Sequence, residues 1–188
     1  MKSFLAVFAI AALVSVGTGL AARPSAAQES SMMVLEDFGA SPRPDLGSWR
    51  MFTDRVMGGV SDGEQAITEV EGRMALHMTG SVSLENNGGF VQSAFTPKRT
   101  LDGKPYTGIR LTVKSNGEEG YYVFLRTRST FMPWSFYSAP IPATTQWSTV
   151  EIPWSSFKKN SVWSNLNPSQ IRQIGIVAYA RELEADIA

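Results

Sequence analysis

The chain has 188 residues, and its 17 Lys and Arg side chains balance 17 Asp and Glu side chains, with one His and no Cys. The absence of cysteine excludes disulfides, thiolate metal sites and thiol nucleophiles. A net charge of zero provides no overall field to attract an anionic membrane or nucleic acid, and we expect no nucleic-acid partner.

The first 27 residues are typical of a secretory signal peptide. Lys2 precedes an unbroken apolar run at residues 4–12, and the segment ends in Ser25-Ala26-Ala27. This order matches the charged start, apolar middle and small-residue cleavage site of such leaders. We expect cleavage near Ala27, export to the periplasm or the extracellular space, and one domain over residues 28–188. An uncleaved leader is the alternative, and only through it does the sequence predict membrane attachment.

The rest of the chain has the two-residue period of β-strands. Apolar and polar residues alternate over 73–79, 108–114 and 148–154. In the first of these segments, Met74, Leu76 and Met78 are expected to face inward. The unbroken apolar runs 123–125 and 174–177 indicate strands buried on both faces. Turn-forming residues separate these segments, and only Asn167-Pro168 could begin a short helical turn. The sequence therefore predicts an all-β, antiparallel β-sandwich.

Acidic and imidazole side chains provide no specific catalytic or metal-binding pattern. His77 is expected on the outward face of its strand. If the first and last strands pair, the acidic pairs at 36–37 and at Glu184 and Asp186 could hold calcium, although they could equally be edge charges that prevent aggregation. A glycosidase needs two facing carboxylates, but any chain with 17 acidic residues offers such pairs. We expect no enzyme activity, no cofactor and no assigned metal site.

The most informative segment is residues 53–63, TDRVMGGVSDG. Its two consecutive glycines permit a positive φ or close packing of the backbone against a neighbour. Asp54 and Ser61 flank them with side chains that can bond turn amides, so one interpretation is a rigid loop that caps itself. The segment lacks the Lys-Ser/Thr of a phosphate-binding loop. A second glycine pair, in residues 86–90, precedes a predicted strand and indicates a turn.

Aromatic residues suggest another candidate surface. Residues 131–137 contain four aromatic side chains beside a proline, and Trp163 lies in a polar loop. If the rings of Trp134, Tyr137 and Trp163 are exposed, they would suit stacking on sugars or contact with a protein. Burial beneath the loops is the alternative.

These segments together resemble the complex I intermediate-associated protein 30 family. Trp49 followed by DRVMGGVS at 54–61 resembles the family signature, and TGSVSLENNGGF at 79–90 resembles its second block. The strand WSTVEIP at 147–153 with Phe157, and the segments 174–176 and 182–184, resemble its later strands. The resemblance covers about residues 33–188.

The resemblance implies a galactose-binding-like jelly roll without catalytic activity. Mitochondrial members assist assembly of respiratory complex I (NADH:ubiquinone oxidoreductase), whereas the leader here points to a chaperone-like assembly or escort role towards a protein partner in the cell envelope. Similar folds occur in carbohydrate-binding modules, which is the alternative function. On this basis we expect the binding surface in the signature segment, with the second block beside it in space. Its residues are Asp54, Arg55, Val56, Met57, Gly58, Gly59 and Ser61, with Asn87, Gly88, Gly89 and Phe90.

Overall fold

The computed structural model describes residues 32–39 and 46–188, and in these residues the regular structure is strands with four short 3₁₀ turns. The strands are β1 (Gly47–Thr53), β2 (Asp62–Val70), β3 (Arg73–Val82), β4 (Phe90–Pro97), β5 (Gly108–Val113), β6 (Tyr121–Thr127), β7 (Phe136–Pro140), β8 (Ser148–Pro153), β9 (Lys158–Asn160), β10 (Ile171–Tyr179) and β11 (Leu183–Ile187). Within the described ranges, no helix has the length and apolar character needed to span a membrane. The expected signal peptide, residues 1–27, lies outside the described residues.

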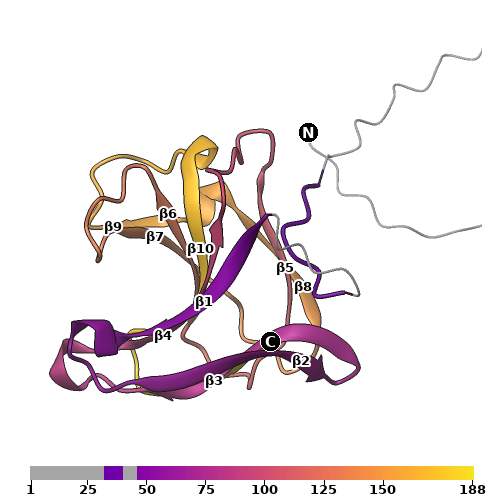
Figure 1. Ribbon diagram of the computed structural model, residues 1–188, viewed down its shortest axis with the longest axis vertical. Coiled ribbons are helices and arrows are strands. Elements are labelled where there is room, and N and C mark those ends of the chain that lie inside the picture. Colours follow the sequence, from indigo (N-terminus) through magenta and orange to yellow (C-terminus); the bar gives the residue numbers. More distant parts are fainter. Residues whose placement is uncertain (1–31, 40–45) are drawn as a thin grey trace, which may run out of the picture. The chain divides into compact units, whose positions relative to one another are not determined.

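One layer of the fold is a six-stranded antiparallel sheet in the order β1-β4-β10-β6-β7-β9 (Figure 1). Neighbouring strands are often far apart in sequence: β4 lies between β1 and β10, and β10 pairs with β6. This connectivity brings the start of β4 beside the end of β1, because Thr53 pairs with Val91. It thereby joins the two signature segments at one end of the sheet.

The second layer contains the three-stranded sheet β11-β3-β2 and the pair β5-β8. A bridge between Ser115 and Ile187 and two backbone hydrogen bonds between Lys114 and Ala188, of 3.0 and 2.9 Å, connect these two sheets. All strand pairs in the two layers are antiparallel. The fold is an antiparallel β-sandwich of the jelly-roll type, as the sequence predicts.

Side chains from both layers form the core, and the apolar runs explain its extent. Val123 and Leu125 of β6 face the core, whereas Phe124 between them faces the opposite side and is buried there in a second cluster. The prediction that these runs are buried on both faces is therefore confirmed. The short turn is also confirmed: Pro168–Gln170 forms a 3₁₀ turn, and the Asn167 side chain accepts a hydrogen bond from the Ser169 amide at 3.1 Å.

Two strand predictions are wrong. Met74 was expected to face the core, but it lies at the start of β3 and its side chain is exposed, whereas Met78, four residues further on, is buried. Residues 36 and 37 form no strand, and the last strand, β11, pairs with β3. The acidic pairs therefore do not meet through pairing of the first and last strands.

Tyr121 connects the two layers through its hydroxyl group. Its ring is buried in the core, and its oxygen accepts a hydrogen bond from the Asp186 amide of β11 at 2.8 Å. The hydroxyl also lies 3.0 Å from the Asn116 side-chain oxygen, to which it donates. Burial raises the pKa of Tyr121 above its ordinary value of 10.0.

We expect Tyr121→Phe to lower the free energy of unfolding by about 0.5–1.5 kcal/mol, because the part-buried Asp186 amide loses its acceptor. Since the folded state holds the phenolic proton more tightly than the unfolded chain, wild-type stability falls as the pH rises beyond about 10, and the variant lacks this component. Urea unfolding at neutral and alkaline pH measures both effects. The control is Tyr106→Phe, because the Tyr106 hydroxyl bonds no described residue. Equal losses of unfolding free energy in the two variants would contradict the role assigned to the Tyr121 hydroxyl.

Candidate functional site

The signature segment forms a compact loop between β1 and β2. A 3₁₀ turn, Asp54–Met57, begins after Thr53, whose side chain accepts a hydrogen bond from the Arg55 amide. Gly58 ends the turn in the left-handed conformation with φ of 92°, which a residue with a side chain adopts only at a cost. The Arg55 guanidinium then closes the loop by donating to the Ser61 carbonyl at 3.0 Å.

The Asp54 carboxylate lies at the centre of this loop and is fully buried. One oxygen accepts from the Ser61 amide at 3.0 Å. The other accepts from the Ser61 hydroxyl and from the amides of Gly89 and Phe90, at 2.6 and 3.3 Å. The Ser61 hydroxyl in turn accepts from the Ser83 amide at 2.9 Å. One carboxylate therefore joins the signature segment to the second block, 35 residues further along the chain.

These hydrogen bonds keep Asp54 charged. Burial alone would raise its pKa, but the Ser61 hydroxyl and three backbone amides donate to the ionised form and outweigh that effect. The pKa of Asp54 therefore lies below the ordinary value of 3.8. A carboxylate that uses its lone pairs in this way is a structural centre and not a free charge for a partner.

The glycines of both blocks provide room for this carboxylate. A Cβ atom at Gly59 would contact the Asp54 side chain, and one at Gly88 would lie 2.5 Å from its Oδ2 atom. Asn87 and Gly89 have φ of 59° and 130°, which bring the chain round so that its amides point at Asp54. The self-capping interpretation of this loop therefore describes its geometry, with the Asp54 carboxylate facing inward.

Four apolar side chains around this network remain exposed, and we call them the apolar tip: Val56 (71% exposed), Met57 (53%), Val60 (42%) and Leu84 (48%). Val56 and Met57 belong to the 3₁₀ turn that Asp54 begins. Val60 and Leu84 adjoin the hydrogen-bonded pair Ser61 and Ser83, so the two loops present them together. None of the hydrogen bonds that build the loop uses these four side chains.

Of the three aromatic residues expected to form a second surface, the structure exposes two and buries one. Trp134 is about half exposed and Trp163 is fully exposed, on neighbouring loops. Tyr137 is completely buried, and its hydroxyl donates to the Ser164 carbonyl at 3.1 Å. The expectation that Tyr137 offers an exposed ring is wrong, because its register in β7 points the ring into the core, beside Leu125.

A third candidate, which the sequence analysis missed, lies on the face of the six-stranded sheet that points away from the core. We call it the aromatic face: Phe90, Tyr122, Phe124, Phe136, Val177 and Tyr179. The rings of Phe124 and Phe136 stack at 3.9 Å, and Tyr179 meets Phe124 edge-on at 5.2 Å. The tyrosines that flank the two apolar runs are the signal that could have identified it.

Gln92 lies in the middle of this face. It pairs with Val177 of β10, and it packs against Gly175, where a Cβ atom would collide with its amide nitrogen. The residue as a whole is 9% exposed, and its amide makes no hydrogen bond with any described residue. Because its polar atoms are not among the buried unpaired ones of the described residues, the amide reaches solvent and is free to bond water or a ligand.

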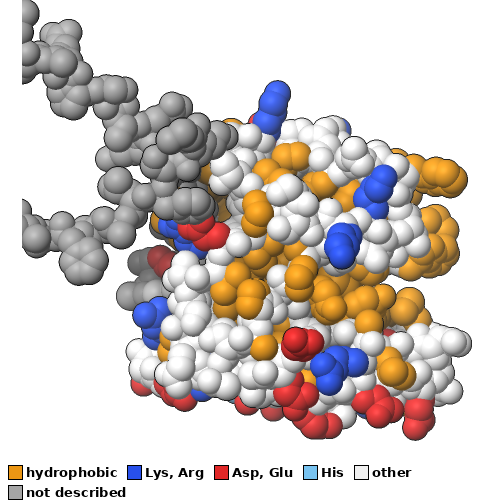
Figure 2. All heavy atoms as spheres, turned by 180° about the vertical axis from the view of Figure 1, so that it is seen from behind, with side chains coloured by type: hydrophobic (Ala, Val, Ile, Leu, Met, Phe, Trp, Pro, Cys, Tyr) orange, Lys and Arg blue, Asp and Glu red, His pale blue; other side chains and the backbone are white. Residues whose placement is uncertain are grey.

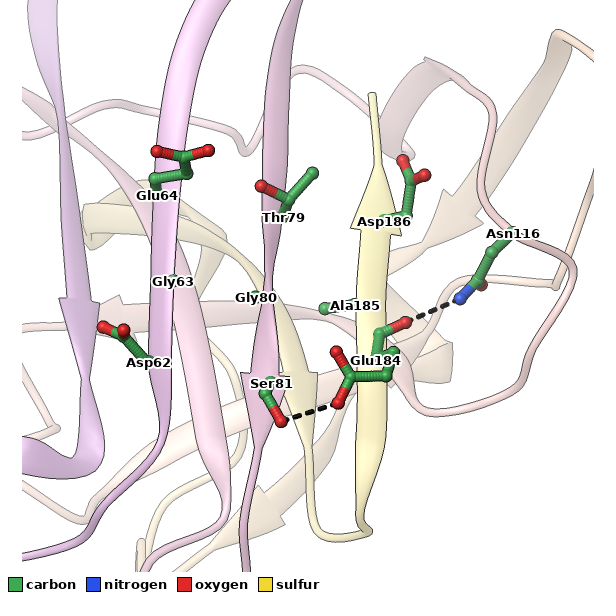
Figure 3. Close-up of a pocket in the computed structure, with 10 residues that line it drawn as sticks. All are labelled: Asp62, Gly63, Glu64, Thr79, Gly80, Ser81, Asn116, Glu184, Ala185 and Asp186. Carbon is green, nitrogen blue, oxygen red and sulfur yellow. Dashed lines mark hydrogen bonds between the residues drawn. The ribbon is translucent and has the colours of Figure 1, made fainter.

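Acidic side chains line a hollow on the outer face of the sheet β11-β3-β2 (Figure 3). Asp62 and Glu64 lie on β2, and Glu184 and Asp186 lie on β11, with β3 between the two pairs. Two strand spacings amount to roughly 10 Å, which is too far for one ion. No cluster of three metal-ligating side chains occurs among the described residues.

The carboxylates of β11 have partners within the chain. Glu184 accepts from the Ser81 hydroxyl at 2.7 Å, and Asp186 contacts the imidazole of His77 at 2.8 Å. His77 faces outward, as predicted, and its hydrogen bond to Asp186 places it at the rim of this hollow. The arrangement fits charged side chains on a solvated sheet better than a calcium site.

We expect Asp54→Asn to lower the free energy of unfolding by about 2–4 kcal/mol, because its amide group would turn a donor towards backbone N–H groups. Asp62→Asn, which loses only an exposed ion pair with Arg55 at 3.5 Å, should change it by less than about 0.5 kcal/mol. The difference in the free energy of unfolding between wild type and Asp54→Asn should have its full size above pH 3.8. It should shrink as the pH falls through the lowered pKa of Asp54. Urea unfolding from pH 7 down to the acid limit tests this, and similar losses in both variants would contradict it.

Comparison with solved structures finds the same fold in other proteins. The family 11 carbohydrate-binding module of a cellulosomal cellulase of Clostridium thermocellum matches with a TM-score of 0.64 at 16% identity, covering 82% of this chain and 88% of that one. The same module in complex with a β-1,3-1,4-mixed-linked tetrasaccharide matches with a TM-score of 0.59 at 17% identity, over 74% and 83% of the two chains. At this level of identity the likeness establishes the fold.

Comparison at the level of sequence identifies the family. No curated protein sequence matched the chain. The family model described as complex I intermediate-associated protein 30 (CIA30) matches residues 37–185, which include both glycine-rich blocks and the later strands. On that match, and with the jelly-roll fold that the resemblance implies, the chain belongs to the complex I intermediate-associated protein 30 family.

Proposed function

We propose that this chain is an exported, non-catalytic binding domain that escorts or helps to assemble a protein partner, and that the apolar tip contacts this partner. The observation that carries the proposal is the exposure of Val56, Met57, Val60 and Leu84 on two loops that the hydrogen bonds of Asp54 and Ser61 join. Clustered exposed apolar side chains are typical of protein-contact surfaces.

The construction of the loop supports this assignment. The structure of the loop depends on the Asp54 carboxylate, the Ser61 hydroxyl and the glycines. The side chains of the apolar tip take no part in these contacts and remain available to a partner. A surface that is already ordered loses little conformational entropy on binding. Met57 adds a flexible, polarisable side chain that adapts to different partners.

Family membership and the expected leader suggest where the partner is found. The family is named for association with intermediates of complex I, which favours a protein client. Residues 1–27 have the pattern of a signal peptide, so we propose a client in the cell envelope.

Val56→Ser combined with Met57→Ser should reduce capture of the client from envelope extract by at least about tenfold, because the centre of the contact loses its apolar area. The measurement is affinity capture with the chain from residue 28 onward, followed by identification of the bound proteins. Ile67→Ser combined with Met74→Ser removes two exposed apolar side chains elsewhere (57% and 47% exposed) and is the matched control. If both double variants capture the same proteins as wild type, the tip is not the contact surface.

Carbohydrate binding is a second candidate, favoured by the aromatic face. Gln92 presents an unpaired amide there, and the hydroxyls of Tyr122 and Tyr179 also bond no described residue. Aromatic rings beside amide and hydroxyl groups suit a sugar, which offers apolar ring faces and a rim of hydroxyls. The solved modules of the same fold are named for carbohydrate binding, and one is in complex with a β-1,3-1,4-mixed-linked tetrasaccharide.

The variant Gln92→Ala distinguishes a role of Gln92 in sugar binding from a purely structural role. If Gln92 binds a ligand, the variant should lose glycan binding by about tenfold or more while its free energy of unfolding changes little, because the amide makes no hydrogen bond within the described residues that the variant could lose. Calorimetric titration with mixed-linked β-glucan oligosaccharides and a glycan array measures binding, with Gln170→Ala as control. Absence of glycan binding by wild type, or binding unchanged in Gln92→Ala, would reject a sugar site on this face.

A further inference from the structure

At the end of the six-stranded sheet opposite the apolar tip, two loops expose large apolar side chains. The loop between β6 and β7 presents Phe131 (86% exposed), Met132 (46%) and Trp134 (54%), and the loop after β9 presents the fully exposed Trp163. We call these four residues the aromatic spikes. The two loops are adjacent, because the Ser135 hydroxyl donates to the Ser161 carbonyl at 2.8 Å.

Hydrogen bonds hold both loops in place where they join the sheet. The Arg126 guanidinium donates to the carbonyls of Met132 and Pro133, and Thr130 bonds back to the Thr127 carbonyl at 2.8 Å. On the other loop, the buried Tyr137 hydroxyl holds the Ser164 carbonyl. The loops are therefore ordered by polar contacts at their bases, while their apolar side chains point away from the core.

The charged side chains of these two loops and of the strands that lead into them are all positive. Arg126, Arg128, Lys158, Lys159 and Arg172 lie on these loops or on the strands that lead into them, and none forms an ion pair with a described residue. Between Glu119 and Glu182 the sequence contains one acidic residue, Glu151, which is paired with Arg110 at 2.7 Å.

The acidic side chains gather on the other layer. Asp62, Glu64, Glu184 and Asp186 lie on the sheet β11-β3-β2. In Figure 2, Asp and Glu side chains line the lower edge, the side on which β2 and β3 lie in Figure 1, and hydrophobic side chains form a band above them. A net charge of zero thus conceals a separation of charge within the molecule.

We propose that the aromatic spikes dock this domain on an anionic lipid surface. Exposed Trp and Phe side chains suit the boundary between lipid headgroups and acyl chains, and nearby Lys and Arg side chains suit anionic headgroups. The unpaired Lys158 and Lys159 beside the spikes provide this charge complementarity, whereas the acidic layer faces away from it. The site is separate from the apolar tip, so a protein client could be held while the domain rests on the membrane.

The test is co-sedimentation of the chain from residue 28 onward with vesicles of phosphatidylcholine containing roughly 30% phosphatidylglycerol, compared with vesicles of phosphatidylcholine alone. Omitting the apolar leader ensures that any binding comes from the folded domain, which contains the whole described core. Wild type should bind the anionic vesicles at least about tenfold more tightly, lose binding as salt rises, and show a blue shift of tryptophan emission on binding.

Phe131→Ser combined with Trp163→Ser should reduce the affinity at least about tenfold, because the inserted apolar area is removed. Lys158→Gln combined with Lys159→Gln should reduce it by about fivefold for each charge. Because all four side chains are exposed, both variants should remain folded, which circular dichroism checks. Ile67→Ser combined with Met74→Ser, exposed elsewhere, should bind as wild type does.

Equal binding to neutral and anionic vesicles, no binding to either, or unchanged binding of the Phe131→Ser/Trp163→Ser variant would overturn the proposal. Loss of a glycan or of a soluble protein partner in that variant, with vesicle binding retained, would also overturn it and assign the spikes to that other ligand. These outcomes do not depend on the apolar tip. The escort proposal is therefore decided separately, by the capture experiment with the Val56→Ser/Met57→Ser variant.

Discussion

The buried carboxylate of Asp54 determines the shape of the end of the molecule where the signature segments meet. Four donors converge on it, from the loop after β1 and from the start of β4. Charged acceptors bonded to several amides are among the stronger polar interactions in proteins, and removing such a centre leaves its donors buried and unpaired. The glycines at 59 and 88 follow from this arrangement, because no larger residue leaves room for the carboxylate.

This network also separates the structural from the functional part of the signature. Asp54 and Ser61 are explained by folding, whereas Val56 and Met57 are not, because they contribute little to the core and face solvent. The opposite end of the sheet repeats the pattern with different chemistry: polar contacts hold the loops, and Phe131 and Trp163 extend from them beside unpaired cations. The domain thus has two apolar ends and, between them, an aromatic sheet face whose Gln92 amide bonds no described residue.

Much of the fold could be predicted from periodicity. Alternation at 108–114 and unbroken apolar runs at 123–125 and 174–177 indicate strands because the side chains of a strand point alternately to its two faces. The failure at Met74 has the same origin, since alternation gives the face but not how far the core extends along the strand. Tyr137 and Trp134 look equivalent in sequence, and only the register of β7 against β6 places one in the core and leaves the other in the loop.

The sequence by itself determined the fold class, the rigid glycine loop and the family, because these depend on local periodicity, on backbone conformation and on a motif that can be compared directly. Only the tertiary structure decided that Asp54 is buried, that Gln92 is unpaired on an aromatic face, and that the charges are separated between the two layers. Each of these depends on strands that are distant in sequence but neighbours in the sheet, as β4 is of both β1 and β10. Composition sums charges over the whole chain, whereas burial and electrostatic fields depend on where the fold places each one.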